Sequence, residues 1–184
     1  MRTQRVNVMA GSVQKLLRRN AYSHVKNLLA KLRAADISSI MLEMNDREQR
    51  SVFSILMERD RQLAAETLKV LGLEWGLDLL LQRPSEEIGE VIQEMESDVA
   101  AAFISALPEE VAQEVLERMD NQESSEVQEL LGYQEETAGR IMTPNVFSLH
   151  EELTVGEAIQ TIQTAQDLEM VFYLVNVWSP LVPR

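Results

Sequence analysis

The sequence predicts a mostly α-helical protein: a right-handed superhelical α-solenoid of short helices, followed by an incomplete β-α-β unit. Three observations lead to this expectation. Apolar residues recur at three- and four-residue intervals through most of the chain, as on amphipathic helices. Part of this pattern occurs twice, first in residues 37–71 and again in residues 88–119. After Gly132 the helical pattern gives way to a strand pattern, a capped helix and a second strand pattern.

Residues 1–33 form a basic helical segment, with eight Lys or Arg and no acidic residue. Its apolar residues stripe one face of a helix pair: Leu16, Leu17, Val25, Leu28, Leu29 and Leu32. Basic residues beside such a stripe fit a helix that lies on an anionic membrane. The stripe fits equally well a helix pair that caps the solenoid, so the sequence leaves both interpretations open.

Residues 34–132 contain the internal repeat, in two units of about three short helices each. Phe53 and Phe103 occupy equivalent places within the units. Pro84 and Pro108 precede acidic residues, which is typical of helix starts, and Gly132 ends the last helix. The matched positions are Ile37, Ile40, Met41 and Met44 with Ile88, Val91, Ile92 and Met95, and Leu63, Ala64, Glu66, Leu68 and Leu71 with Val111, Ala112, Glu114, Leu116 and Met119.

Residues 145–177 read as a β-α-β unit. Residues 145–149 form a short strand pattern, and a capping box at Thr154 and Glu157 opens a helix. Residues 170–177 are a continuous apolar run typical of a buried strand. Two parallel strands and one helix cannot bury a core alone, so we expect the chain to stop within a domain. Residues 178–184 are interpreted as a cloning tail, since the last four match a cleaved thrombin site.

Composition excludes several classes of function. The chain has no cysteine, which excludes disulfides, thiolate metal sites and cysteine nucleophiles. No uncharged apolar run reaches the roughly 18–20 residues that a membrane-spanning helix needs. Phosphate-binding loops, nucleophile elbows, zinc-protease motifs and EF-hand spacings do not occur. We therefore do not expect an enzyme.

Acidic residues concentrate in one part of the chain. The net charge is −13, and residues 84–136 hold 16 acidic side chains against Arg118 alone. Such a segment repels nucleic acid, because affinity for phosphate needs Lys and Arg. It suits a response to cations instead, although solvated acidic helix faces would give the same composition.

A motif at residues 132–144, GYQEETAGRIMTP, resembles the junction between the N domain and the first CBS domain of the MgtE family of magnesium channels. The residues that fit the family pattern are Tyr133, Glu135, Ala138, Gly139, Met142 and Thr143. Residues 154–159 are similar to the first CBS helix and residues 171–177 to the strand after it. The resemblance implies an N domain at 34–132, and a junction with a partial CBS domain at 133–177.

The resemblance also implies a function: a cytosolic regulatory domain that binds Mg²⁺ through acidic residues and favours the closed pore. Matching the repeats to the family gives Glu66, Glu86, Glu87 and Glu90 as metal ligands. The implied partners are the remaining CBS and transmembrane domains of the same chain and a second copy in a homodimer, on the cytoplasmic side of the membrane. The alternative is a helical-repeat interaction scaffold without ion sensing. An adaptor for anionic lipid or nucleic acid, acting through the N-terminus, is a third hypothesis.

Overall fold

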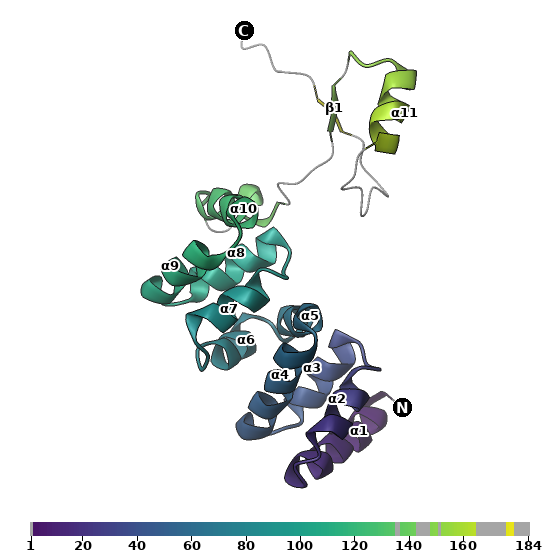
Figure 1. Ribbon diagram of the computed structural model, residues 1–184, viewed down its shortest axis with the longest axis vertical. Coiled ribbons are helices and arrows are strands. Elements are labelled where there is room, and N and C mark those ends of the chain that lie inside the picture. The colour runs from purple at the N-terminus through teal and green to yellow at the C-terminus, as the bar shows by residue number, and fades with distance from the viewer. Residues whose placement is uncertain (1, 135–136, 143–147, 151, 165–175, 179–184) are drawn as a thin grey trace. The chain divides into compact units, whose positions relative to one another are not determined.

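The computed structural model describes residues 2–134, 137–142, 148–150, 152–164 and 176–178. The chain divides into two compact units, Met1–Met142 and Thr143–Arg184. The first unit holds the helices α1 to α10 and a short 3-10 helix, η1 (Ala138–Ile141) (Figure 1). The second holds β1, α11 and β2. Each unit is described by itself.

A helical hairpin opens the first unit. It consists of α1 (Arg2–Arg18) and α2 (Tyr22–Leu29), joined by a turn in which Asn20 has a positive φ of 54°. Asn is among the few residues that tolerate this conformation. Val13, Val25 and Leu29 are fully buried, because α1 packs on α3 and α2 on α4. The apolar stripe of residues 1–33 therefore serves to dock the hairpin on the following helices.

The internal repeat is visible in the helix boundaries. The number of residues between the starts of α3 and α7 equals the number between the starts of α4 and α8. The same holds for α5 and α9 compared with α6 and α10. Each unit has four helices rather than the expected three or so; in the first, the additional break falls at Gly72, whose φ is +83°. The helices are α3 (Ala34–Leu42), α4 (Asp46–Arg59), α5 (Arg61–Leu71), α6 (Leu73–Leu80), α7 (Ser85–Ile92), α8 (Ser97–Ala106), α9 (Glu109–Arg118) and α10 (Asn121–Leu131).

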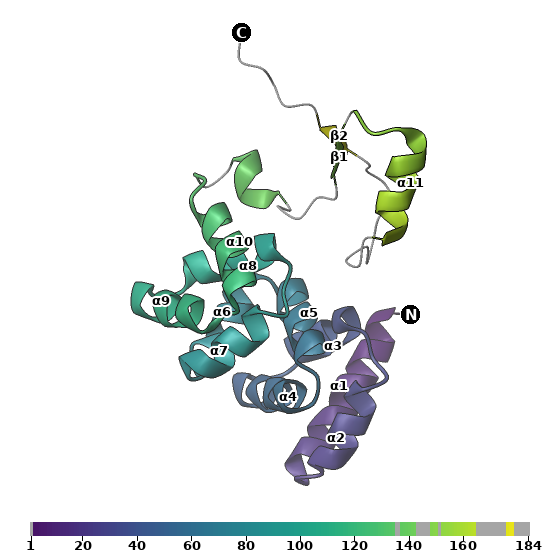
Figure 2. The ribbon, with the colours of Figure 1, turned by 45° about the horizontal axis from the view of Figure 1, so that its top comes forward.

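Helices two apart in the sequence pack against each other, which gives two rows. The odd-numbered helices α1, α3, α5, α7 and α9 form one row, and the even-numbered helices α2 to α10 form the other. Figures 1 and 2 show this progression from the purple α1–α2 end to the green α9–α10 end of the first unit. The buried apolar residues form one cluster that runs from Ala10 to Leu130. Each helix thus buries its apolar face against its neighbours in the stack.

Helix starts and ends follow the sequence signals. Asn45 and Glu48 form a capping box at α4, where the Asn45 Oδ1 accepts from the Glu48 N–H at 3.0 Å. Pro84 and Pro108 precede α7 and α9, and Gly132 follows α10. The helix punctuation expected at these last three positions is confirmed.

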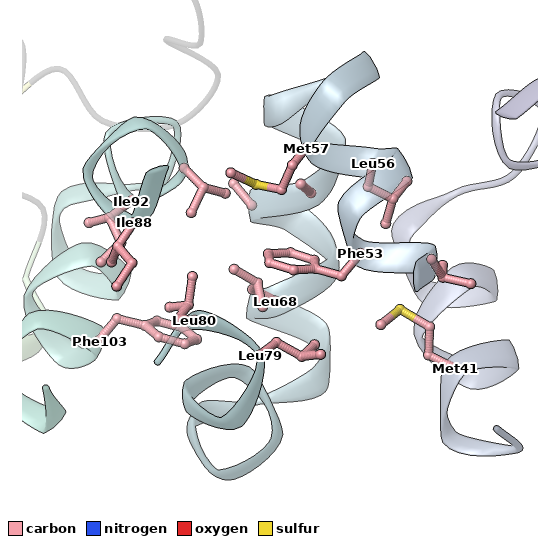
Figure 3. Close-up of a cluster of buried hydrophobic side chains, with 14 of the residues drawn as sticks. Met41, Phe53, Leu56, Met57, Leu68, Leu79, Leu80, Ile88, Ile92 and Phe103 are labelled. Atoms are coloured by element: carbon pink, nitrogen blue, oxygen red, sulfur yellow. The ribbon is translucent and has the colours of Figure 1, made fainter. Parts of the chain in front are cut away.

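The contact between the repeats is closely packed. Phe53, Leu68, Leu80 and Phe103 come from four different helices and meet in the apolar cluster drawn in Figure 3. Gly76 of α6 lies against Phe103 of α8: a Cβ atom on this glycine would stand 2.6 Å from Cε1 of the ring. This distance is too short for two carbon atoms, so the approach of α6 to α8 requires glycine.

The second unit contains β1 (Ser148–His150), α11 (Val155–Thr164) and β2 (Asn176–Trp178). The strands pair in parallel, with Leu149 opposite Val177. At the start of α11, the Glu157 carboxylate accepts from the Thr154 N–H at 2.9 Å and from the Thr154 hydroxyl, and these bonds hold the pKa of Glu157 below its ordinary value. The predicted strand residues 145–147 and 170–175 lie outside the described part of the chain.

Candidate cation-responsive surface

The second repeat carries the acidic surface that the sequence predicts. Residues 85–131, which span α7 to α10, hold 14 acidic side chains and one basic residue, Arg118. The cations that pair with these acids come from earlier in the chain. Arg61 of α5 lies 2.7 Å from Glu90, and Lys69 pairs with Glu96. The first repeat therefore supplies part of the neutralising charge of the second.

Neutral donors make two polar contacts between helices two apart in this repeat. The Ser97 hydroxyl donates to Glu126 at 2.9 Å, and Ser85 donates to Glu114. A hydroxyl satisfies a carboxylate oxygen but does not cancel its charge. These contacts tie α7 to α9 and α8 to α10 while leaving the surface anionic.

The four predicted metal ligands lie on two neighbouring helices. Glu66 is on α5, and Glu86, Glu87 and Glu90 are on α7, which packs against α5. Glu66 and Glu86 are exposed, whereas Glu87 and Glu90 are half-buried and paired with arginines. Within the described residues, no three His, Asp or Glu side chains gather closely enough to hold a metal ion. The four residues thus do not form a complete site by themselves, and their role as ligands stays a prediction.

Arg83 joins the two repeats and holds one of these acids. Its guanidinium lies 5.2 Å from the centroid of the Phe53 ring, in a cation–π contact. Nη1 donates to Glu87 at 2.6 Å and Nη2 donates to the Ser54 hydroxyl at 2.5 Å. The side chain is only 17% exposed. Arg83 therefore fixes the start of α7 against α4, a role that its place just before the acidic run did not indicate.

Glu123 of α10 lies near other acids of the second repeat. Burial raises the pKa of its carboxyl group above the ordinary value, and the nearby acids Asp120, Glu94 and Glu126 raise it further. Its Oε2 atom is buried and has no hydrogen-bond partner among the described residues. In the sequence, the signal that could have indicated this crowding is the spacing of acidic residues three apart along α10. The crowding shows that carboxylates at α10 and just after α7 repel one another here.

The junction motif packs on the end of the first unit. The 3-10 helix η1 contacts α8 and α10, and the Arg140 Nη2 atom reaches the Ala101 carbonyl at 3.4 Å. A Cβ atom on Gly139 would stand 2.6 Å from Cδ1 of the Tyr133 ring. This agrees with the need for a glycine in the motif, because the two segments approach within the space of a methyl group.

No helix in the described part of the chain is long and apolar enough to cross a membrane.

A protein-family model matches part of the chain. The family model described as the MgtE intracellular N domain matches residues 32–136, more than half of the chain. No curated protein matches the sequence.

Two solved structures share the fold. The soluble part of a magnesium transporter is 19% identical with a TM-score of 0.67, and the match covers 86% of this chain and 61% of that one. The cytosolic domain of the Mg²⁺ channel MgtE in complex with ATP is 24% identical with a TM-score of 0.76, and the match covers 93% and 69%. The chain thus spans about three fifths of the first structure. The match of residues 32–136 shows that the chain belongs to the MgtE family, through its intracellular N domain.

Proposed function

We propose that the chain is the intracellular regulatory part of an MgtE-type magnesium transporter, in which Mg²⁺ bound by acidic residues favours the closed pore. Family membership supports this proposal, as does the fold shared with the soluble part of a magnesium transporter and the cytosolic domain of a Mg²⁺ channel. The observation that carries it is the charge of the second repeat, with 14 acids against one base. Crowded carboxylates repel each other until a cation neutralises them.

The four glutamates divide into two pairs with different tasks. Glu66 and Glu86 are exposed and form no hydrogen bond or ion pair with the described residues, so their carboxylates are free to meet an ion. Glu87 and Glu90 must first exchange Arg83 and Arg61 for the ion. Mg²⁺ commonly takes one or two carboxylates and keeps several waters. Glu66 and Glu86 are accordingly the first ligands, and the others respond as the local charge changes.

The second unit is the start of a CBS domain in this proposal, and the two rows of helices form a right-handed superhelical solenoid. Parallel pairing of β1 with β2 around α11 supports the CBS assignment. The junction at residues 133–177 then leads to the rest of the CBS region and to transmembrane domains of the same protein, on the cytoplasmic side of the membrane. A homodimer is the expected assembly. Carboxylates of those domains would add further ligands to an ion that Glu66 and Glu86 already bind.

The test compares Mg²⁺ with Na⁺ at matched ionic strength. We expect Mg²⁺ to raise the thermal midpoint more than Na⁺ does, because a bound divalent ion relieves repulsion that screening only weakens. The variant Glu66→Gln/Glu86→Gln should lose this difference. The control Glu43→Gln/Glu74→Gln removes two exposed acids of the first repeat and should keep it. Equal effects of the two salts on the wild type would contradict ion sensing and favour a helical-repeat scaffold.

A further inference from the structure

We infer that the α1–α2 hairpin is a binding surface for anionic phospholipid headgroups, with a phosphate subsite in the recess beside its turn. The inference rests on the proposed function only in that it places the chain at a membrane. Its basis is the distribution of charge and burial on residues 5–33. It requires no insertion of a helix into lipid, because the apolar stripe of the hairpin already packs against the core of the helical stack.

The outward face of α1 is basic. Arg5, Val8, Ser12 and Lys15 follow one another at three- and four-residue intervals, so they share a face of α1, and all four are exposed. Arg19, also exposed, lies in the turn directly after the helix. The opposite face carries the buried Val13 and its neighbours. Val8 is 65% exposed, which places a small apolar group among the cations. This arrangement suits contact with the headgroup layer of a membrane.

The cations of residues 5–33 are available to an outside partner. Arg5, Lys15, Arg18, Arg19, Lys26, Lys31 and Arg33 make no ion pair with any described residue, and all except the half-buried Lys26 are exposed. Residues 1–33 contain no acid that could neutralise them. An extended positive surface without internal partners attracts anions over about a Debye length, roughly 8–10 Å at physiological salt.

A recess of about 470 Å³ lies between the hairpin turn and the start of α4. Arg18 and Arg47 line it from the two sides, together with Tyr22 and Ser51. Its one acid, Glu48, accepts from the Gln14 side chain at 2.9 Å and from the Asn45 N–H at 3.4 Å. The Tyr22 and Ser51 hydroxyls donate within the protein, to Asn20 Oδ1 and to the Arg47 carbonyl. The two guanidinium groups are therefore the donors that the recess offers to the oxygens of a phosphate group.

The surrounding charge favours a membrane over nucleic acid. Beyond residue 33 the chain has 9 basic and 30 acidic residues. The hairpin contacts α3 and α4 and lies at the end of the helical stack opposite α9 and α10 (Figure 2). An anionic plane can meet this end alone, whereas a long polyanion lying along the stack would meet the acidic second repeat.

Vesicle co-sedimentation of the whole chain tests the inference. Phosphatidylcholine vesicles with and without phosphatidylglycerol are compared in EDTA, so that the Mg²⁺ response plays no part. We expect binding only to the phosphatidylglycerol vesicles, and its loss at high salt. Equal binding to both vesicles, or binding to neither, overturns the inference while leaving the Mg²⁺ proposal intact. Tighter binding of a duplex oligonucleotide than of anionic vesicles overturns it in favour of nucleic acid.

Paired variants test the recess. Each Lys or Arg near an anionic leaflet strengthens binding about fivefold, so Arg18→Gln/Arg47→Gln should weaken vesicle binding about 25-fold. The control Arg59→Gln/Arg118→Gln removes the same charge from exposed positions outside the hairpin and should bind nearly as wild type. Circular dichroism checks that both variants fold. Equal losses in the two variants, or wild-type binding by the recess variant, would show that the recess is not part of the lipid-binding surface.

Discussion

Replacing Gly76 with Ala tests whether the contact between the repeats depends on close backbone approach. The added methyl group would stand 2.6 Å from Cε1 and 2.9 Å from Cζ of Phe103, and 3.5 Å from Cδ2 of Leu68. The Phe103 ring is 2% exposed and packed on all sides, so it has little room to turn away. The strain must therefore move α6 relative to α8.

Two opposing effects set the magnitude. Ala in place of Gly favours a helix by about 1 kcal/mol, because the unfolded chain loses fewer conformations. Overpacking a well-filled core costs about 1–3 kcal/mol. The contact distance lies well inside van der Waals range, which places the cost at the upper end. From the difference of these two effects, we expect Gly76→Ala to lower the free energy of unfolding by about 2 kcal/mol.

Urea unfolding followed by circular dichroism measures this difference, and Gly11→Ala is the matched control. Gly11 is also a helical glycine, but nothing lies within 4 Å of its Cβ position. The same substitution there should raise the free energy of unfolding by about 1 kcal/mol. If the two variants are stabilised alike, the packing argument for Gly76 is wrong.

Three further changes probe the junctions and the acidic repeat. Gly139→Ala should destabilise η1 by about 1 kcal/mol through its clash with the Tyr133 ring, measured by hydrogen exchange; Tyr133→Ala in the same chain should remove the penalty. Glu123→Gln should stabilise the protein at neutral pH. Because the folded-state pKa of this carboxyl is raised, the wild type loses stability as pH rises through it, and thermal midpoints across pH should show a smaller loss in the variant. Arg83→Gln should cost about 2 kcal/mol in urea unfolding, and Arg83→Lys should recover only part, since an ammonium cannot reproduce the guanidinium contacts with Phe53 and Glu87.

Local signals in the sequence were enough to predict much of the helical fold. The periodicity of Ile37, Ile40 and Met41 marks a buried face, and all three are 1% exposed or less. Pro84 and Pro108 mark helix starts because proline suits the beginning of a helix. The break at Gly72 was missed, since no polar loop surrounds it and the positive φ that separates α5 from α6 is a property of the folded chain.

The candidate site was less predictable, because charge neutralisation depends on contacts between distant segments. The sequence places Glu90 in an acidic run, yet Arg61 of the first repeat pairs with it across α5 and α7. Arg83 stands just before the run but turns back to Ser54 of α4. Such pairings follow from the two-row stacking of helices, which periodicity alone does not give. The acidic count therefore located the acidic side chains in the second repeat but not which carboxylates are engaged.

Comparison of equivalent positions separates what the fold requires from what function adds. Arg61 and Lys69 on α5 correspond to Glu109 and Glu117 on α9, the equivalent helix of the second repeat. All four are exposed, so either sign of charge is compatible with the same helix and the same stacking. Most buried positions, in contrast, remain apolar in both repeats, as with Ile37 and Ile88. Because packing does not demand the acidic choice, and repulsion among the acids opposes folding, the concentration of acid in the second repeat needs a cause other than the fold. The proposed binding of a cation would supply one.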